Sequence, residues 1–294
     1  MYEEAPPPGP LAGVARCVWR SATAGPKRIV PDGCLDLVVG DGAVFVAGPD
    51  TSAWSSVTRP EAELRGVRFT PGRAAAVLGV AADELRDRRV PLAELWGRSG
   101  EELAERLLAG EISPARAVAT RLGEVPEPDP AVAALIEQLD AGAARVSDAV
   151  AMLAAPERPK ATLVASDAPK AALVASDAPK ATLGRSGRRD AREVDLAAAR
   201  VEDPFAISER RLRRRFVQAV GYGPATYLRV TRFQRAVALA PHSPGLAALA
   251  AAAGYADQAH LSRDCRALTG LTPRAYFARP STVDSTEGDR LRSA

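Results

Sequence analysis

The sequence is poor in the residues that build metal sites and disulfide frameworks. It has three cysteines, Cys17, Cys34 and Cys265, and two histidines, His242 and His260. No CxxC or HExxH spacing occurs, so a structural or catalytic zinc site has little support. We interpret the cysteines as reduced thiols packed as small hydrophobic side chains. We expect no cofactor, no metal and no enzymatic activity.

Long apolar runs are missing as well. No uncharged apolar run reaches the roughly 18 residues that a membrane-spanning helix needs. The first ten residues, MYEEAPPPGP, are acidic and rich in proline, unlike a signal peptide. These absences predict a protein without a membrane span that works in the cytoplasm.

Lysine is scarce, with 4 lysines against 35 arginines. Three of the four, Lys160, Lys170 and Lys180, open successive copies of a ten-residue unit that begins as Lys160-Ala-Thr-Leu-Val-Ala-Ser-Asp-Ala-Pro169. This period is shorter than that of solenoid repeats. We interpret residues 156–189 as an exposed low-complexity insertion without chemistry of its own.

Charge is unevenly distributed along the chain. Residues 1–155 carry 16 basic and 22 acidic side chains, a net charge of −6, whereas residues 185–280 carry 17 basic and 8 acidic ones, a net charge of +9. Such a split predicts an acidic module joined to a basic module that binds a polyanion.

The first part of the chain has the pattern of short strands separated by turns. Strands are expected at 14–19, 34–39, 44–46 and 64–69, because apolar and β-branched residues there are bounded by Gly, Pro and Asp. Short helices are expected at 72–79, 81–85, 101–108 and 114–122. Three prolines in 125–130 then favour a hinge, followed by a helix to about Asp140.

The later part is helical and contains an arginine-rich segment. A helix is expected to begin behind Ser208 and to carry Arg210, Arg211, Arg213, Arg214 and Arg215. A long helix, 224–240, follows Gly221-Tyr-Gly-Pro224, and a helix at 245–253, a turn at 254–256 and a helix at 257–268 form a helix-turn-helix pattern. Taken alone, the arginine run fits a solvated face as well as a polyanion-binding one.

Several motifs in register resemble the DNA-binding domain of AraC/XylS-type transcription regulators. They are Arg210-x-Leu212-x-Arg214-x-Phe216, Gly221-x-Gly-Pro224-x-x-Tyr-Leu228, Arg232-x-x-x-Ala236, Leu249-Ala250-x-x-x-Gly254-Tyr-x-Asp-x-x-His260-Leu-Ser-Arg263 and Thr269-Gly-Leu-Thr-Pro273-x-x-Tyr276. The segments 31–39, 66–72 and 90–95 resemble a poorly characterised sensor region of some actinobacterial members. The resemblance implies an α+β protein: a β-rich N-terminal sensor domain with short helices, then an all-α domain with two helix-turn-helix units joined by a long helix.

The resemblance also implies a division of the chain. We expect a sensor domain at 1–125, a hinge and packing helix at 126–144, the DNA-binding domain at 145–280 with the insertion inside it, and a disordered tail at 281–294. The first helix-turn-helix unit would open with the helix 146–153 and continue with one at 191–200. There are three departures from the family pattern: the stretched lead-in with Pro204, the insertion between the first unit's opening helix and its second, and Arg215 and Cys265 at places usually held by apolar side chains.

Residue roles follow from the resemblance and from base-recognition chemistry, in which arginine binds guanine with two hydrogen bonds. The side chains expected at base edges are Arg210, Arg213, Arg214, Ala259, His260 and Arg263. Those expected at phosphates, where they position the protein and make affinity depend on salt, are Ser208, Arg211, Arg232, Arg235, Gln258 and Ser262.

The sequence therefore favours a sequence-specific DNA-binding transcription regulator, read as an activator, that addresses two successive major grooves and is controlled by a signal sensed in its N-terminal domain. Its expected partners are double-stranded DNA, a small-molecule effector and, for an activator, RNA polymerase. Two alternatives stay open: a cysteine-based sensor that accepts alkyl groups on Cys34, and an interaction protein whose DNA binding is impaired by the insertion.

Overall fold

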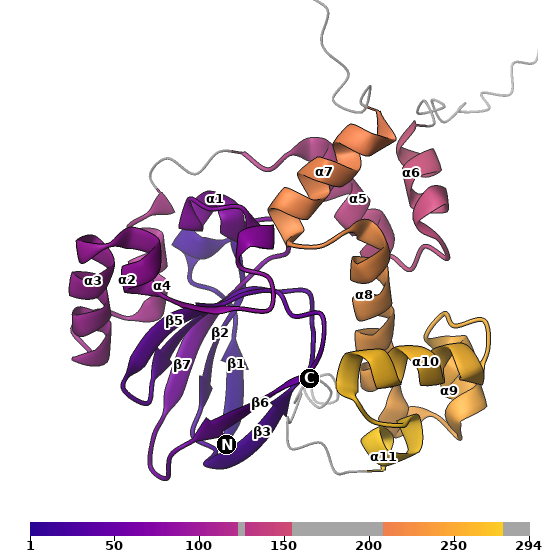
Figure 1. The fold of residues 1–294 in the computed structure, drawn as a ribbon, viewed down its shortest axis with the longest axis horizontal. Helices are drawn as coiled ribbons and strands as arrows, with labels where there is room; N and C mark the ends of the chain where they lie inside the picture. Colours follow the sequence, from indigo (N-terminus) through magenta and orange to yellow (C-terminus); the bar gives the residue numbers. More distant parts are fainter. Residues whose placement is uncertain (123–126, 155–207, 279–294) are drawn as a thin grey trace, which may run out of the picture. The chain divides into compact units, whose positions relative to one another are not determined.

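The first 122 residues fold around a six-stranded antiparallel sheet with the strand order β1-β2-β7-β4-β5-β8 (Figure 1). A separate pair, β3 with β6, forms a two-stranded antiparallel ribbon. The strands are β1 Tyr2–Ala5, β2 Ala15–Ser21, β3 Gly25–Ile29, β4 Asp36–Gly40, β5 Ala43–Ala47, β6 Trp54–Thr58, β7 Leu64–Phe69 and β8 Arg89–Pro91. We call residues 1–122 the N-terminal half.

Alternating side chains place one face of this sheet in a core. Val44 and Val46 of β5 are buried in the period-two pattern of a half-buried strand, whereas β4 buries three consecutive residues, Leu37, Val38 and Val39. Gly66 of β7 lies between β2 and β4, where an added Cβ would come within 2.4 Å of the Leu37 carbonyl oxygen and 2.6 Å of the Trp19 ring. Only glycine fits at this crossing.

Short helices complete the N-terminal half. They are α1 Ala74–Leu78, α2 Leu92–Trp96, α3 Arg98–Leu108 and α4 Pro114–Ala119, with 3-10 turns η1 Gly9–Leu11 and η2 Ala82–Glu84. Helices α2, α3 and α4 lie together beside the sheet in Figure 1 and pack on β4, β5 and β7. Leu11, Phe69, Leu92 and Leu107 are fully buried in the resulting core.

The second part of the chain is helical and has its own core. Its helices are α5 Pro130–Asp140, α6 Val146–Ala154, α7 Glu209–Val220, α8 Pro224–Leu239, α9 Leu246–Ala252, α10 Gln258–Thr269 and α11 Pro273–Phe277, with a 3-10 turn η4 Ala240–His242. Helix α8 is central and packs against α5, α6, α7, α9 and α10. Leu135, Phe216, Tyr227, Phe233 and Leu261 meet in this core. We call residues 127–154 and 208–278 the helical half.

The computed structural model describes residues 1–122, 127–154 and 208–278, which belong to one compact unit. Within these ranges, no helix is long and apolar enough to cross a membrane. The predicted insertion at 156–189, the helix expected at 191–200, Pro204 and the tail at 281–294 lie outside the described residues.

The α+β fold expected from the sequence is confirmed. All four expected strands are present as β2, β4, β5 and β7, and the long helix runs over Pro224–Leu239. Four further strands, β1, β3, β6 and β8, were not expected. Pro, Gly or charged residues hide the alternation of a strand in β1, β3 and β8, and β1 and β8 form the two edges of the six-stranded sheet. The segment expected as a helix at 81–85 is a 3-10 turn.

Candidate DNA-binding interface

Helix α7 has one apolar and one arginine-rich face. Ser208 is its N-cap, and the Ser208 hydroxyl accepts a hydrogen bond from the Arg211 amide at 3.3 Å. Leu212, Phe216 and Val220 are buried at a spacing of four residues, so they hold one side of the helix on the core. The Phe216 ring packs edge-on against Tyr227 of α8, with ring centroids 5.7 Å apart.

Helix α10 has the same construction. Asp257 is its N-cap, and the carboxylate accepts a hydrogen bond from the His260 amide at 2.6 Å. Leu261, Cys265 and Leu268 are buried along the inner side. The Cys265 thiol fills its place in the core as a small apolar group. Helix α9 packs on both α8 and α10, which completes a helix-turn-helix unit.

The two helices share a register from cap to cap. Aligning the N-caps Ser208 and Asp257 brings Leu212 onto Leu261 and the C-cap Gly221 onto Gly270. In this register Arg214 falls on Arg263. The helices α7 and α10 therefore present arginine at one common place relative to their caps, although their sequences differ at most exposed positions.

Most of the side chains predicted to meet base edges are accessible. Arg210, Arg213 and Arg214 of α7 are exposed, and so are Ala259 and Arg263 of α10. None of these four guanidinium groups has an acidic partner within residues 1–122, 127–154 and 208–278. His260 is half-buried, with its ring edge-on against Tyr255 at a centroid distance of 5.0 Å.

The same alignment of α7 with α10 makes two further pairs of residues equivalent in position. Arg211 coincides with His260, and Arg213 coincides with Ser262. The sequence assigned a phosphate to Arg211 but a base to His260, and a base to Arg213 but a phosphate to Ser262. The geometry of the helices offers no reason for this difference, whereas Arg214 and Arg263 carry the same predicted role.

Some side chains predicted to contact phosphates are accessible to solvent, and others already form hydrogen bonds within the protein. Ser208, Arg211 and Gln258 are exposed, and Ser262 is half-buried. Arg235 is half-buried, and its guanidinium donates to the carbonyl oxygens of Asp140 at 3.1 Å and Ala253 at 3.5 Å. Its assignment to a phosphate stays a prediction.

Arg232, which the sequence assigns to a phosphate, has partners inside the protein. Its side chain is 8 % exposed, and Nη2 donates to the Ala144 carbonyl oxygen at 3.0 Å. Its guanidinium also lies 5.5 Å from the centroid of the Tyr255 ring. Arg232 therefore joins α8 to the segment before α6 and to the turn before α10, and its assignment to a phosphate stays a prediction.

Comparison with protein families agrees with this geometry. Residues 203–279 match the family model described as a helix-turn-helix domain. The chain carries an AraC-type helix-turn-helix domain at its C-terminus. It is thus a DNA-binding transcription regulator. Residues 3–91 match a domain of unknown function (DUF6597).

Two solved structures show a likeness over most of the chain, and both are of ToxT from Vibrio cholerae O395. One is 10% identical with a TM-score of 0.40, and the match covers 90% of this chain and 97% of that one. The other, bound to (E)-4-(8-methylnaphthalen-1-yl)but-3-enoic acid, is 7% identical with a TM-score of 0.41 and coverages of 94% and 98%. At these values no residue role is carried from ToxT to this chain. A search of the curated proteins found no match.

A polar cluster behind α10 of the AraC-type domain was not anticipated. The His260 Nε2 atom lies 3.7 Å from Oδ2 of Asp264. Burial raises the pKa of the Asp264 carboxyl above its ordinary value, while His260 and Arg229 act in the opposite direction. The Asp264 Oδ2 atom is buried and accepts no hydrogen bond from the described residues. The i, i+4 spacing of these residues was the only available sequence signal.

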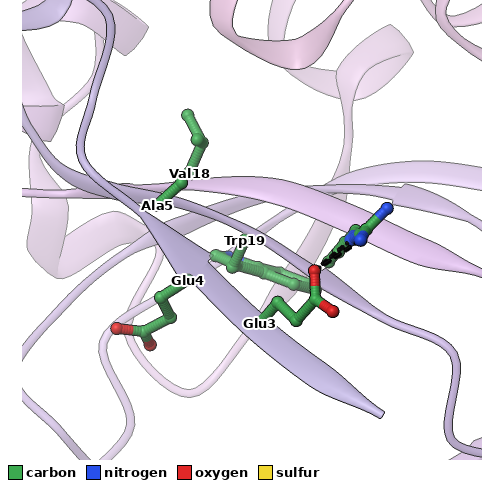
Figure 2. A pocket seen from close by; sticks show the side chains of 6 residues that line it. Glu3, Glu4, Ala5, Val18 and Trp19 are labelled. Atoms are coloured by element: carbon green, nitrogen blue, oxygen red, sulfur yellow. Dashed lines mark hydrogen bonds and ion pairs between the residues drawn. The ribbon is translucent and has the colours of Figure 1, made fainter. Parts of the chain in front are cut away.

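The shallow hollow drawn in Figure 2 does not have the size of an effector site. It lies over β1 and β2, where the Trp19 side chain lies beside Glu3 and Glu4 and where Glu3 pairs with Arg20 at 2.5 Å. Its volume is about 160 Å³, below the roughly 300 Å³ at which pockets for drug-sized ligands begin. No cluster of three or more His, Cys, Asp or Glu side chains suited to a metal occurs in the described ranges.

Proposed function

We propose that this protein is a sequence-specific transcription regulator that reads two successive major grooves, with α7 in one and α10 in the next, under the control of a signal sensed in the N-terminal half. The observation that carries the proposal is the common register of the two helices. Equal caps and equal buried positions leave Arg214 and Arg263 exposed at equivalent places.

Helix α8 is the physical link between the two units. Its 16 residues span about 24 Å at 1.5 Å per residue, and it packs against both α7 and α10. Two helix-turn-helix units on one chain can address neighbouring grooves about one helical turn apart. A single protomer thus supplies both DNA-binding units.

We assign the residues as follows. Arg214 and Arg263 are the principal base-reading side chains, since an arginine guanidinium matches the O6 and N7 acceptors of guanine. Arg210, Arg213, Ala259 and His260 complete the base-facing set. Ser208, Arg211, Gln258, Ser262 and Arg235 meet phosphates and give the affinity its salt dependence.

The N-terminal half is proposed as the sensor. Support comes from its separate core, which includes residues up to Val118, whereas the core of the helical half starts at Ala131. We propose domains at 1–125, 126–144 and 145–280, and the change of core between Val118 and Ala131 supports the first of these boundaries. The proposed partners are double-stranded DNA, a small-molecule effector and, for an activator, RNA polymerase, and the protein works in the cytoplasm, where that DNA is.

Selection of bound duplexes from a random-sequence library, followed by footprinting of the selected site, tests the proposal. We expect two protected half-sites about one helical turn apart, bound on the order of 1,000-fold more tightly than unrelated DNA. Equal affinity for selected and unrelated duplexes at physiological salt would contradict the proposal.

The two alternatives have less support. Cys34 is 4 % exposed, and burial raises the pKa of its thiol well above the ordinary value, so an alkyl acceptor would be both hidden and protonated. Helix α7 is fully formed, and Arg210, Arg211, Arg213 and Arg214 are exposed on it, which gives no support to an impaired first unit.

A further inference from the structure

The recognition helices α7 and α10 end in the same way. Each stops at a left-handed glycine, Gly221 with φ 99° and Gly270 with φ 71°. The last carbonyl oxygens of a helix lack an amide partner inside the helix and carry the negative end of its dipole. Such an end attracts a cationic hydrogen-bond donor, and in both helices that donor comes from the N-terminal half.

At the end of α10 the donors belong to the β3–β6 ribbon. Arg28 of β3 donates from Nη1 to the Thr269 carbonyl oxygen at 2.5 Å. The Ala53 amide, just before β6, donates to the Leu268 carbonyl oxygen at 2.7 Å. Arg28 of β3 and the residue that precedes β6 thus hold the last turn of α10.

At the end of α7 the donor is Arg86, which follows η2. Its Nη1 atom donates to the Gly221 carbonyl oxygen at 3.3 Å. The fit around Gly221 is tight, because an added Cβ would lie 2.3 Å from Cγ of Pro49 and 3.0 Å from the Ala82 carbonyl oxygen. The C-terminal end of α7 therefore packs directly against the N-terminal half.

The link helix α8 is held as well. Gln234 donates from Nε2 to the Pro31 carbonyl oxygen at 2.6 Å. The turn that contains Pro31 also lies against Tyr227, whose ring would be 3.2 Å from a Cβ added to Gly33. The N-terminal half thus contacts α7, α8 and α10, and each recognition helix is fixed at the end opposite its arginine-bearing first turns.

We propose that Arg28 and Arg86 are positioning residues for DNA recognition: by capping the C-terminal ends of α10 and α7, they let the N-terminal half set the separation of the two recognition helices and hence the half-site spacing that the protein accepts. This inference rests on the proposed function. A signal that moves the β3–β6 ribbon or the η2 segment would change that separation, which gives the N-terminal half a direct route to DNA binding.

The first test measures the separation without DNA. Spin labels at Gln218→Cys on α7 and Ala267→Cys on α10 occupy exposed positions, whereas the native cysteines are buried. Pulsed electron resonance on the full chain should give a narrow distance distribution that broadens in Arg28→Met and Arg86→Met. Arg28→Lys, which keeps a cationic donor, should restore the narrow distribution. Arg20→Met is the matched control, because Arg20 is 63% exposed and pairs with Glu3 within the sheet.

The second test uses DNA. With the selected duplex, inserting two base pairs between the half-sites should weaken wild-type binding by about tenfold or more, and the Met variants should lose much of that penalty. A narrow distance distribution and an unchanged spacing penalty in both Met variants would overturn the inference. Loss of sequence preference in the wild type itself would instead overturn the proposed function, while the distance measurement would still decide the inference.

Discussion

Arg215 of α7 forms an ion pair through Nε with Oδ2 of Asp129, the residue that also caps α5. The other carboxylate oxygen of Asp129 accepts hydrogen bonds from the amides of Ala131 at 3.1 Å and Val132 at 3.3 Å. The Asp129 side chain therefore caps the start of α5, directly after the predicted hinge, and also binds α7 to α5. Arg215, unexpected at a place usually apolar, has a structural partner and is not free for DNA.

Separating the two tasks of Asp129 is possible by substitution. Asp129→Asn keeps a capping oxygen and removes the charge, so we expect a loss below about 1 kcal/mol in the free energy of unfolding. Asp129→Ala removes both and should cost about 1–2 kcal/mol. Urea unfolding at constant m-value measures both changes. Equal losses for the two variants would show that the cap contributes nothing.

Arg263 and Arg211 should differ in how their loss affects DNA binding. Arg263→Ala should weaken binding to the selected site by about 1–3 kcal/mol and relax preference at one position. Arg211→Ala should weaken all duplexes alike and reduce the salt slope by about 1. Binding to a panel of single-base variants at several salt concentrations distinguishes these outcomes, and identical sequence-blind losses would contradict the division into base and phosphate contacts.

Arg232 should matter for stability rather than for salt dependence. Arg232→Ala leaves the Ala144 carbonyl oxygen without its donor, so we expect a loss of about 1–3 kcal/mol in the free energy of unfolding. The salt slope of DNA binding should stay at the wild-type value. Arg211→Ala, at an exposed position of α7, serves as the comparison and should cost less than about 0.5 kcal/mol. A reduced salt slope for Arg232→Ala would restore its assignment to a phosphate.

The cysteines should be inert in the folded protein. Burial raises the pKa of Cys17 to about 12 and also raises the pKa of Cys34 and Cys265. We expect no adduct after native treatment with iodoacetamide and three adducts after treatment in urea, measured by mass spectrometry. Gln218→Cys, at an exposed site, is the positive control. A native adduct at Cys34 would revive the alkyl-acceptor alternative.

Asp50 should make stability depend on pH. Burial raises the pKa of Asp50 to about 6, although Arg89 and Trp54 act in the opposite direction. The folded value exceeds the unfolded one of about 3.9, so the stabilising contribution is present below pH 4 and is lost as the pH rises through 6. Between pH 4 and 7 the wild type should lose about 1 kcal/mol more than Asp50→Asn, a value reduced for solvent screening.

Urea unfolding of both proteins at the two pH values checks this expectation. Glu105→Gln, an exposed substitution on α3, measures the general effect of removing one negative charge. A parallel pH dependence in the wild type and in Asp50→Asn would show that Asp50 titrates at the same pH in the folded and unfolded chains.

Features with local causes could be predicted from the sequence. Ser208 starts α7 because its side chain satisfies an amide three residues ahead, and Gly221 ends it because glycine tolerates a positive φ. Both lie within the segment that they shape. The same holds for β4 and β5, whose apolar and β-branched residues and intervening Gly40-Asp-Gly42 turn are read directly from neighbouring positions.

Features that depend on distant partners could not be predicted. Arg28 meets Thr269 across 241 positions, and nothing near Arg28 in the sequence indicates a helix end. Arg232 was expected on a surface because one side of α8 was taken to be free. In the structure α8 is surrounded by five helices, so even an arginine on it is buried.

The Ala53–Leu268 contact has a practical consequence for spectroscopy. The next residue, Trp54, donates to Asp50 at 2.9 Å and lies under the Arg89 guanidinium at 3.9 Å, so its indole emission is sensitive to movement of the ribbon. All three tryptophans, Trp19, Trp54 and Trp96, lie in the N-terminal half. The native chain therefore carries its own fluorophores in the half that holds none of the proposed DNA contacts, and any change in their emission on adding DNA reports communication between the two halves without a label.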